Sequence, residues 1–253
     1  IFPNNLGKNK PSITGFIMLL NAETGEPQAL MDASFLTALR TGAVSGLATN
    51  YFATDTARHV AIIGSGTQAR TQLEAVAAVR DIQHVSLWSR NIKNAQQFAI
   101  ELENQYDINV YESIPLAIRD ADIICTATNS TEPLIHFEDV QPHAHINAIG
   151  SHSPSMREIS NDVLSHAVVI ADQLEAVLAE SGEIISAVKE LQLKQDSIIE
   201  IGHWLNQKNT DYKNQLTVFK SVGLAIQDLS VAALVYQNAT HKNLGMSFSL
   251  SGQ

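Results

Sequence analysis

The chain is poor in cysteine and in basic residues. Cys125 is the only cysteine among 253 residues, so no disulfide can form within the chain, and a reducing compartment is expected. Lysine and arginine number 16 against 26 aspartate and glutamate residues, which gives a formal net charge of -10. Because no basic cluster relieves this excess, we expect no nucleic acid and no anionic membrane as partners.

Long apolar runs are also missing. No segment approaches the length of a membrane span, and the first residues lack the basic and then apolar pattern of a secretory signal. We therefore expect a cytoplasmic protein. The chain starts at Ile1-Phe2-Pro3 without a methionine, and we expect a further N-terminal portion before it. A hydrophobic content of 45% allows one large or two modest domains.

The most informative segment is a short apolar strand, residues 59–63, that runs into a Gly-x-Gly-x-x-Ala turn and then a helix. Gly64 permits the sharp turn, Gly66 lets a pyrophosphate approach the backbone, and Ala69 lets the helix pack on the sheet. The helix directs its free N–H groups and positive dipole end at the phosphates. This pattern predicts a dinucleotide site, with contacts from Gly64, Ser65, Gly66, Thr67, Gln68 and Ala69.

The end of the second predicted strand, residues 84–88, bears on the choice of nicotinamide cofactor. An acid at this position accepts hydrogen bonds from the ribose of NAD, but here no acid is present. Hydroxyl, amide, guanidinium and ammonium groups suit a 2′-phosphate instead. We therefore favour NADP(H) over NAD(H), which stays open, with contacts from Ser89, Arg90, Asn91 and Lys93. Alternatively, Arg90 and Lys93 are solvated residues at the start of the next helix.

Further strand and helix signals alternate along the chain. Strands are expected at 108–111, 122–128, 145–149 and 167–171, and the alternation predicts a Rossmann-like, doubly wound parallel sheet of the α/β class. Cofactors bind at the carboxyl edge of such a sheet. Residues at the ends of two of these strands are therefore candidate cofactor contacts: Thr126, Ala127, Thr128, Gly150 and Ser151.

Two flanking pieces do not follow this alternation. Strands at 16–20 and 28–31 surround a turn with Gly25 and Pro27, and a helix of small residues is expected at 37–51. A last helix, 224–237, carries apolar residues spaced to pack on that helix. We predict a dinucleotide-binding domain at 53–202, with residues 1–52 and 203–253 forming one substrate-binding and dimerisation domain.

Several segments together resemble one family, the ornithine cyclodeaminase and mu-crystallin family, which includes alanine dehydrogenases and ketimine reductases. Besides the glycine turn they are Thr24-Gly-Glu-Pro27, Ala29-Leu-Met-Asp32, Leu36-Thr-Ala-Leu-Arg-Thr-Gly-Ala43, Asn147-Ala-Ile-Gly150 and Phe219-Lys-Ser-Val-Gly-Leu-Ala-Ile-Gln-Asp228. The resemblance covers nearly the whole chain. It implies a homodimer with a split α+β substrate domain, a small amino or imino acid as substrate, and cofactor contacts at Ser12, Ser221, Val222 and Gly223.

The resemblance also implies a substrate-binding role for Arg40. Its two-pronged guanidinium would hold the substrate carboxylate and a cofactor phosphate. The alternative is an ion pair inside a helix, with Asp32 as a candidate partner. The substrate-binding lysine and a further arginine of the family are expected upstream of Ile1.

One departure from the family pattern concerns the reaction. Cyclodeaminases carry an aspartate after the fifth strand, where this chain has His152, and the following Gly-Lys pair is absent. An imidazole titrates near neutral pH and can donate a proton, which suits the reduction of a C=N bond. Alternatively, His152 is a loop residue without a chemical role. Asp228 either orients substrate or water, or complements the dipole of its helix.

The sequence thus predicts an NAD(P)-dependent oxidoreductase that acts on the α-carbon C–N bond of a small amino or imino acid. Reduction of a pyrroline-2-carboxylate type ketimine is favoured. The alternatives are ornithine cyclodeamination, an alanine dehydrogenase-like or amino-acid-conjugate dehydrogenase, and a non-catalytic, crystallin-like NADP(H)-binding protein. No metal is expected, because the histidines and acids lack ligand spacing.

Overall fold

The computed structural model describes residues 5, 14–207 and 210–248. Contacts between residues divide the chain into two units. The larger unit comprises Thr41–Leu224, and the smaller one combines residues up to Arg40 with those from Ala225 onward. Helix α1 (Ala33–Phe52) contributes residues to both. Within the described residues, no helix is both long and apolar enough to cross a bilayer.

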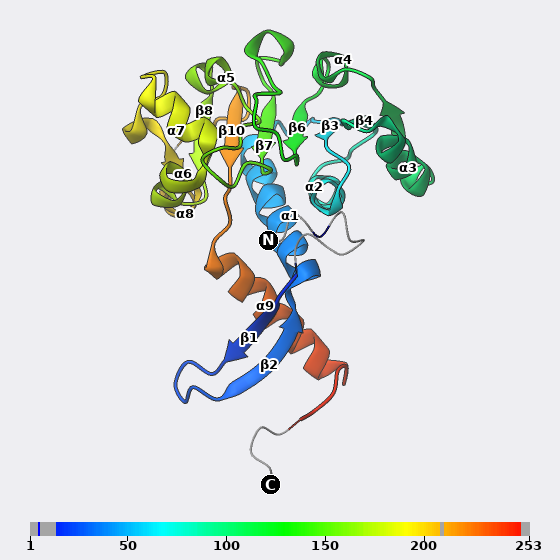
Figure 1. Cartoon of the computed structure of the whole chain (residues 1–253), viewed down its shortest axis with the longest axis vertical. Coiled ribbons are helices and arrows are strands. Elements are labelled where there is room, and N and C mark those ends of the chain that lie inside the picture. Colours follow the sequence, from blue (N-terminus) through cyan, green and yellow to red (C-terminus); the bar gives the residue numbers. More distant parts are fainter. Residues whose placement is uncertain (1–4, 6–13, 208–209, 249–253) are drawn as a thin grey trace. The chain divides into compact units, whose positions relative to one another are not determined.

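The larger unit is built on an eight-stranded parallel sheet (Figure 1). Its order is β5-β4-β3-β6-β7-β10-β8-β9. The strands are β3 (His59–Ile63), β4 (His84–Trp88), β5 (Asp107–Val110), β6 (Ile123–Thr126), β7 (His145–Ala148), β8 (Val168–Ala171), β9 (Ile199–Glu200) and β10 (Thr217–Lys220).

The helical segments of the larger unit lie between these strands. They are α2 (Thr67–Ala77), α3 (Ile92–Leu102), α4 (Ile114–Ile118), the 3-10 turn η2 (Phe137–Asp139), α5 (Asn161–His166), α6 (Leu174–Glu180), α7 (Gly182–Lys189), the 3-10 turn η3 (Gln195–Ser197) and α8 (Ile201–Gln207).

The order of the strands indicates where a ligand would bind to the sheet. From β3 the chain proceeds outward through β4 to β5 and then returns to β6, which pairs with the other side of β3. In open parallel sheets, ligands bind at the carboxyl ends of the strands where the order reverses, here between β3 and β6. The predicted Rossmann-like doubly wound sheet is confirmed.

One strand comes from a segment that the sequence predicts for the other domain. β10 inserts between β7 and β8 and pairs with both in parallel. All its residues are buried, including Lys220. Residues 217–220 of the segment 203–253 therefore belong to the large sheet, while the proposed domain boundaries stay predictions. The strand is only four residues long and lies far in sequence from its neighbours, so no local pattern distinguishes it.

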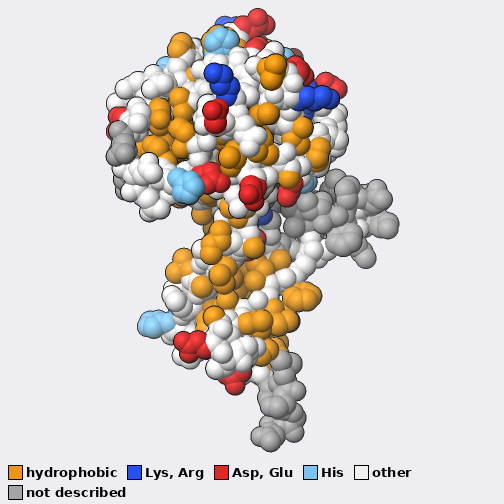
Figure 2. Space-filling model, turned by 90° about the vertical axis from the view of Figure 1, so that its left-hand side faces the viewer, with side chains coloured by type: hydrophobic (Ala, Val, Ile, Leu, Met, Phe, Trp, Pro, Cys, Tyr) orange, Lys and Arg blue, Asp and Glu red, His pale blue; other side chains and the backbone are white. Residues whose placement is uncertain are grey.

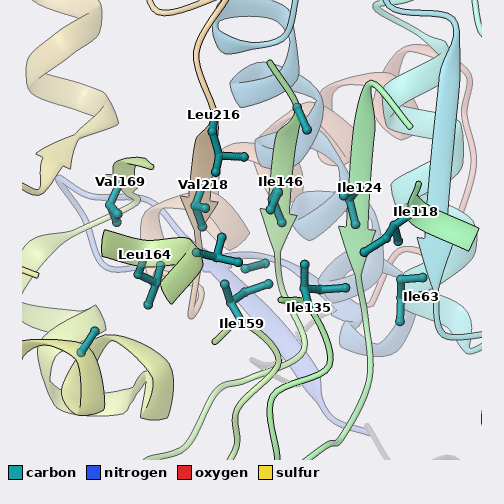
Figure 3. Packing of buried hydrophobic residues seen from close by; sticks show 14 of the residues in the cluster. Ile63, Ile118, Ile124, Ile135, Ile146, Ile159, Leu164, Val169, Leu216 and Val218 are labelled. Carbon is teal, nitrogen blue, oxygen red and sulfur yellow. The ribbon is translucent and has the colours of Figure 1, made fainter. Parts of the chain in front are cut away.

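The core lies on both faces of the sheet because successive strand residues point to opposite faces. On one face Ile63, Ile124 and Ile146 pack with Ile118 of α4 and Leu164 of α5 (Figure 3). On the other face Ile62 and Cys125 pack with α2 and α3, while Phe219 packs with Phe52 of α1 and Ile201 of α8. Each fully buried aliphatic side chain contributes roughly 1.5–3 kcal/mol.

Small residues in α1 bring it close to α2. A Cβ on Gly42 would lie 2.6 Å from the carbonyl oxygen of Thr71, and one on Gly46 would lie 3.0 Å from that of Ala75. Side chains at these positions would push the helices apart. The two glycines thus fix the position of α2, whose first turn follows the glycine-rich turn.

The smaller unit contains an antiparallel hairpin of β1 (Phe16–Leu20) and β2 (Pro27–Asp32), together with α9 (Ala225–His241). The side chain of Asp32 accepts hydrogen bonds from the backbone N–H groups of Ser34 and Phe35, and so caps α1. α9 contacts β1. Among the apolar residues of α9, Ala232 is fully buried and Leu229 is 49% exposed.

Candidate functional site

The candidate site lies along the carboxyl edge of the large sheet, where the loops after β3, β4, β6, β7 and β10 begin. Because these strands are parallel and paired, their ends lie on one edge. The candidate cofactor residues that the structure describes lie in these loops, at the end of β6 (Thr126), or in the first turns of α2 and α3. Ser12 falls outside the described residues.

Gly64 needs to be a glycine for two reasons. Its φ is +126°, a region that other residues rarely adopt, and a Cβ there would lie 2.5 Å from the carbonyl oxygen of Ala127. Its backbone N–H donates to the carbonyl of Trp88 at 2.8 Å. The turn thus passes tightly between the ends of β4 and β6.

Gly66 differs from Gly64. Its φ is -85°, and a Cβ there would meet no atom within 4 Å. It is the N-cap of α2, makes no side-chain cap, and the first turn of α2 contains no acidic residue. The open space and the unopposed N–H groups fit a pyrophosphate, as dinucleotide binding requires.

The remaining residues of the turn have distinct places. Thr67, Gln68 and Ala69 form the first turn of α2, and Ala69 is fully buried between the helix and the sheet, as the motif predicts. Ser65 shares a 2.8 Å hydrogen bond between hydroxyls with Ser89, at the end of β4. This contact joins the glycine turn to the predicted ribose-binding position.

The residues after Ser89 begin α3. Asn91 is the N-cap of this helix and accepts a 3.1 Å hydrogen bond from the backbone N–H of Lys93. Arg90 and Lys93 are exposed. Asn91 thus has a structural role, and both cationic side chains are accessible to a ligand.

Glu158 joins two of the loops, and the sequence analysis missed it. Its side chain is fully buried. Oε1 accepts from the N–H and the hydroxyl of Thr128, each at 2.7 Å, while Oε2 accepts from the Thr126 hydroxyl at 2.8 Å and the Gly150 N–H at 2.7 Å. Burial raises the pKa of this carboxyl, whereas Lys220 opposes the rise. No periodicity or motif singles out this acid.

Lys220, at the end of β10, is also fully buried. Its Nζ donates to the carbonyl oxygen of Ser151 at 2.6 Å and lies 2.9 Å from Oε1 of Glu183, a fully buried acid of α7. Glu183 places an opposite charge beside the buried ammonium group and so offsets part of the cost of burying it. The hydrogen bond from Nζ to the Ser151 carbonyl ties the loop after β7 to β10.

Asp172 holds the loop after β10 in place. Oδ2 accepts from the hydroxyl of Ser221 at 2.7 Å and from the N–H groups of Val222 at 3.1 Å and Gly223 at 3.0 Å. Gly223 has a φ of +91°, which favours glycine. The predicted cofactor residues 221–223 are thus held in one conformation by an acid that sequence reasoning did not find.

His152 lies in the loop after β7 and is exposed. Its Nδ1 is 2.8 Å from the carbonyl oxygen of Gly150. Since a carbonyl only accepts, Nδ1 carries the hydrogen, and Nε2 is the position at which the ring gains or loses a proton. The geometry therefore suits proton transfer at Nε2.

Two other predicted residues meet in the smaller unit. Arg40 Nε donates to Oδ1 of Asp228 at 3.1 Å, and Nη1 donates to Oε1 of Gln227 at 3.1 Å. The acid paired with Arg40 is thus Asp228, while the alternative candidate, Asp32, caps α1. These contacts engage two of the five N–H groups of the guanidinium.

Two buried residues outside the loops are chemically inert. Burial raises the pKa of the Cys125 thiol to about 12. Burial lowers the pKa of His145 to about 3, and its Nδ1 lies 2.8 Å from the hydroxyl of Thr217. Across the described ranges, no group of three or more histidine, cysteine or acidic residues is arranged to hold a metal ion.

Comparisons with known proteins agree with this geometry. The family model of the ornithine cyclodeaminase/mu-crystallin family matches residues 1–243. The chain belongs to this family. It is 39% identical over 251 residues to the Delta(1)-pyrroline-2-carboxylate reductase of Bacillus cereus (strain ATCC 14579), covering 97% of this chain and 77% of the relative.

Two solved structures of family relatives are similar in fold. The Thermococcus litoralis Delta(1)-pyrroline-2-carboxylate reductase in complex with NADH and L-proline has a TM-score of 0.94 and 36% identity, covering 98% of this chain and 78% of that one. An archaeal alanine dehydrogenase dimer with bound NAD has a TM-score of 0.92 and 35% identity, with coverage of 98% and 78%.

Proposed function

We propose that this chain is an NAD(P)-dependent ketimine reductase that reduces a small cyclic α-imino acid of the pyrroline-2-carboxylate type. The observation that carries the proposal is the turn from Gly64 to Ala69. It lies at the switch point of the sheet, and the space beside Gly66 is open. The chain is also 39% identical to a reductase of this substrate class.

The bound cofactor would supply hydride to the carbon of the C=N bond. The residues of the chain bind and orient it: the N-terminus of α2 holds the pyrophosphate, and the loops after β6, β7 and β10 hold the nicotinamide half. Glu158 and Asp172 hold these loops in place through hydrogen bonds to their backbone. Proposed contacts in them are Thr126, Ala127, Thr128, Gly150, Ser151, Ser221, Val222 and Gly223.

We propose NADP(H) as the preferred cofactor. The exposed Arg90 and Lys93 lie at the position where an NAD enzyme carries an acid, and the Ser89 hydroxyl is close to the glycine turn. A 2′-phosphate would receive charge-assisted hydrogen bonds there. The test compares Kd for NADPH and NADH in the wild type and in an Arg90→Gln, Lys93→Gln variant, which should weaken only NADPH binding.

Arg40 is the proposed ligand of the substrate carboxylate. Its pairing with Asp228 orients the guanidinium, and three of its N–H groups are not engaged in the contacts with Asp228 and Gln227. Protonated His152 is the proposed donor of a proton to the imine nitrogen, from Nε2. The hydrogen bond from Nδ1–H to the Gly150 carbonyl orients the ring.

The smaller unit also suggests a homodimer. Phe16, Met18 and Leu20 alternate along β1, and each is at least 48% exposed. Hydrophobic side chains also gather over the surface of this unit in Figure 2. Contiguous exposed apolar surface of this kind marks interfaces, and a second copy of the chain is the proposed occupant.

The decisive experiment measures initial rates of NADPH and NADH oxidation with pyrroline-2-carboxylate. Loss of absorbance at 340 nm together with formation of proline supports the proposal. If neither cofactor is consumed while ornithine yields ammonia and proline with added NAD, the protein is a cyclodeaminase. If nucleotide binds and no substrate turns over, the protein is a binding protein.

A further inference from the structure

Four hydrogen-bond donors surround the carboxylate of Glu158, two at each oxygen. Each oxygen accepts one threonine hydroxyl and one backbone N–H: Oε1 from Thr128, and Oε2 from Thr126 and Gly150. A hydroxyl can rotate to accept a hydrogen bond, but a backbone N–H only donates. Both oxygens must therefore remain acceptors.

The contacts continue the connection between β6 and β7 beyond the last paired residues, Thr126 and Ala148. Thr126 is the last residue of β6 and Thr128 follows it, whereas Gly150 lies beyond the end of β7. A Cβ at Gly150 would overlap the Thr128 carbonyl oxygen and the Glu158 carboxylate, so these loops are in close contact. The carboxylate is thus the shared acceptor through which the two loops are held together.

These loops lie on one side of the switch point. The end of β4, where the adenine-side ribose would bind, is on the other side of β3. The loops after β6 and β7 therefore face the nicotinamide half of a cofactor. The loop after β7 also carries His152, whose Nδ1 contacts the carbonyl of Gly150. The N–H of the same glycine donates a hydrogen bond to Glu158.

We infer that Glu158 is a positioning residue whose buried carboxylate holds the loops after β6 and β7 in the arrangement that binds the nicotinamide half of the cofactor and orients His152. The inference rests on the proposed function. Lys220 assists by holding the carbonyl of Ser151, the next residue of the same loop. Glu158 contacts the reacting groups only through these loops.

The test is the isosteric variant Glu158→Gln. Whichever way the amide is turned, its NH₂ group faces the backbone N–H of either Thr128 or Gly150, so one buried N–H loses its acceptor and the loops separate. We expect Kd for the preferred nucleotide to rise about tenfold or more, and kcat with pyrroline-2-carboxylate to fall. KM for the imino acid should change less than about threefold, because Arg40, the proposed ligand of its carboxylate, belongs to neither of these loops.

A matched control is Asp162→Asn. Asp162 also receives a backbone N–H on each oxygen, from Val163 at 2.8 Å and from Phe137 at 3.4 Å, but its described contacts include none of the proposed cofactor residues. Both variants are expected to lose stability. Only Glu158→Gln should lose nucleotide affinity and show a displaced pH profile of kcat. Equal nucleotide affinities in Glu158→Gln and the wild type would overturn the inference.

A second measurement needs no variant and serves if Glu158→Gln does not fold. Hydrogen exchange of the Gly150 and Thr128 amides in the nucleotide-free wild type should be slow, since both are hydrogen-bonded to a buried carboxylate. Exchange at the rate of an unprotected amide contradicts the inference. Failure of the proposed function has a separate signature, because the wild type would then oxidise neither NADPH nor NADH with pyrroline-2-carboxylate, whatever its affinity for nucleotide.

Discussion

Alanine at Gly64 is expected to lower the stability of the protein, whereas alanine at Gly66, two residues away, is expected to lower its affinity for nucleotide. At Gly64, the left-handed backbone costs an alanine about 1–3 kcal/mol. Relieving a 2.5 Å approach to the Ala127 carbonyl costs about 1–3 kcal/mol more. The stiffer unfolded chain offsets about 0.4–1 kcal/mol. Gly64→Ala should therefore destabilise the protein by about 1–6 kcal/mol.

At Gly66 the backbone is ordinary, and a Cβ would meet no atom within 4 Å. Loss of the glycine N-cap costs about 0.5–1 kcal/mol, and the stiffer unfolded chain returns about the same amount. The fold should tolerate Gly66→Ala. The new methyl group occupies the space proposed for the pyrophosphate, and overpacking of about 1–3 kcal/mol there weakens nucleotide binding by about fivefold to 150-fold.

The assay combines urea unfolding with titration of NADPH and NADH followed by nucleotide fluorescence. Gly64→Ala should shift the unfolding midpoint, and Gly66→Ala should shift Kd alone. Wild-type nucleotide affinity in Gly66→Ala would refute the assignment of the turn as the cofactor site. Wild-type stability in Gly64→Ala would refute the contact with the β6 loop.

Three further outcomes are expected. Arg40→Lys should raise KM for pyrroline-2-carboxylate about tenfold with little change in nucleotide Kd. The reason is that an ammonium group cannot contact Asp228 and the substrate carboxylate in the two-pronged manner of a guanidinium. An unchanged KM in steady-state assays would contradict the proposed role of Arg40 as the carboxylate ligand. Burial lowers the pKa of His145 to about 3, so its contribution to stability is present above pH 6.5 and is lost as the pH falls towards 3. The free energy of unfolding should fall by up to about 1.4 kcal/mol per pH unit in this range. Urea unfolding at pH 7.5 and 5.5 measures this loss, which should be smaller in His145→Gln. Cys125, whose pKa burial raises to about 12, should resist alkylation at pH 8 in the native protein and react once unfolded, and rapid native labelling in a mass-spectrometric assay would contradict its burial.

Local patterns predicted the elements whose signal is local. The predicted strands 16–20 and 84–88 have the same bounds in the structure. The helix predicted at 37–51 begins earlier, at Ala33, because Asp32 supplies the cap. The glycine turn could be predicted because each of its residue types answers a local steric need, and the structure shows that need at Gly64 and Ala69.

The residues that hold the loops could not be predicted in this way. Glu158 and Asp172 accept hydrogen bonds from segments 8 to 51 residues away in the sequence, and Lys220 of β10 pairs with Glu183 of α7. β10 is likewise defined by its two neighbours in the sheet. In each case the determinant is a tertiary contact, and one sequence alone carries no record of it.

The acidity of the chain and its proposed affinity for a polyanionic cofactor are compatible because of where the charges lie. At the carboxyl edge, Glu158 and Asp172 face the loop backbone and accept its N–H groups, while the first turn of α2 contains no acid. Hydrogen-bonded in this way, the two carboxylates direct their charge at the loops that they hold. The groups left to meet the phosphates are the N–H groups of α2 and the exposed Arg90 and Lys93. A net charge of -10 therefore argues against nucleic acid, which needs a broad basic surface, and does not argue against a dinucleotide, which needs only a few local donors.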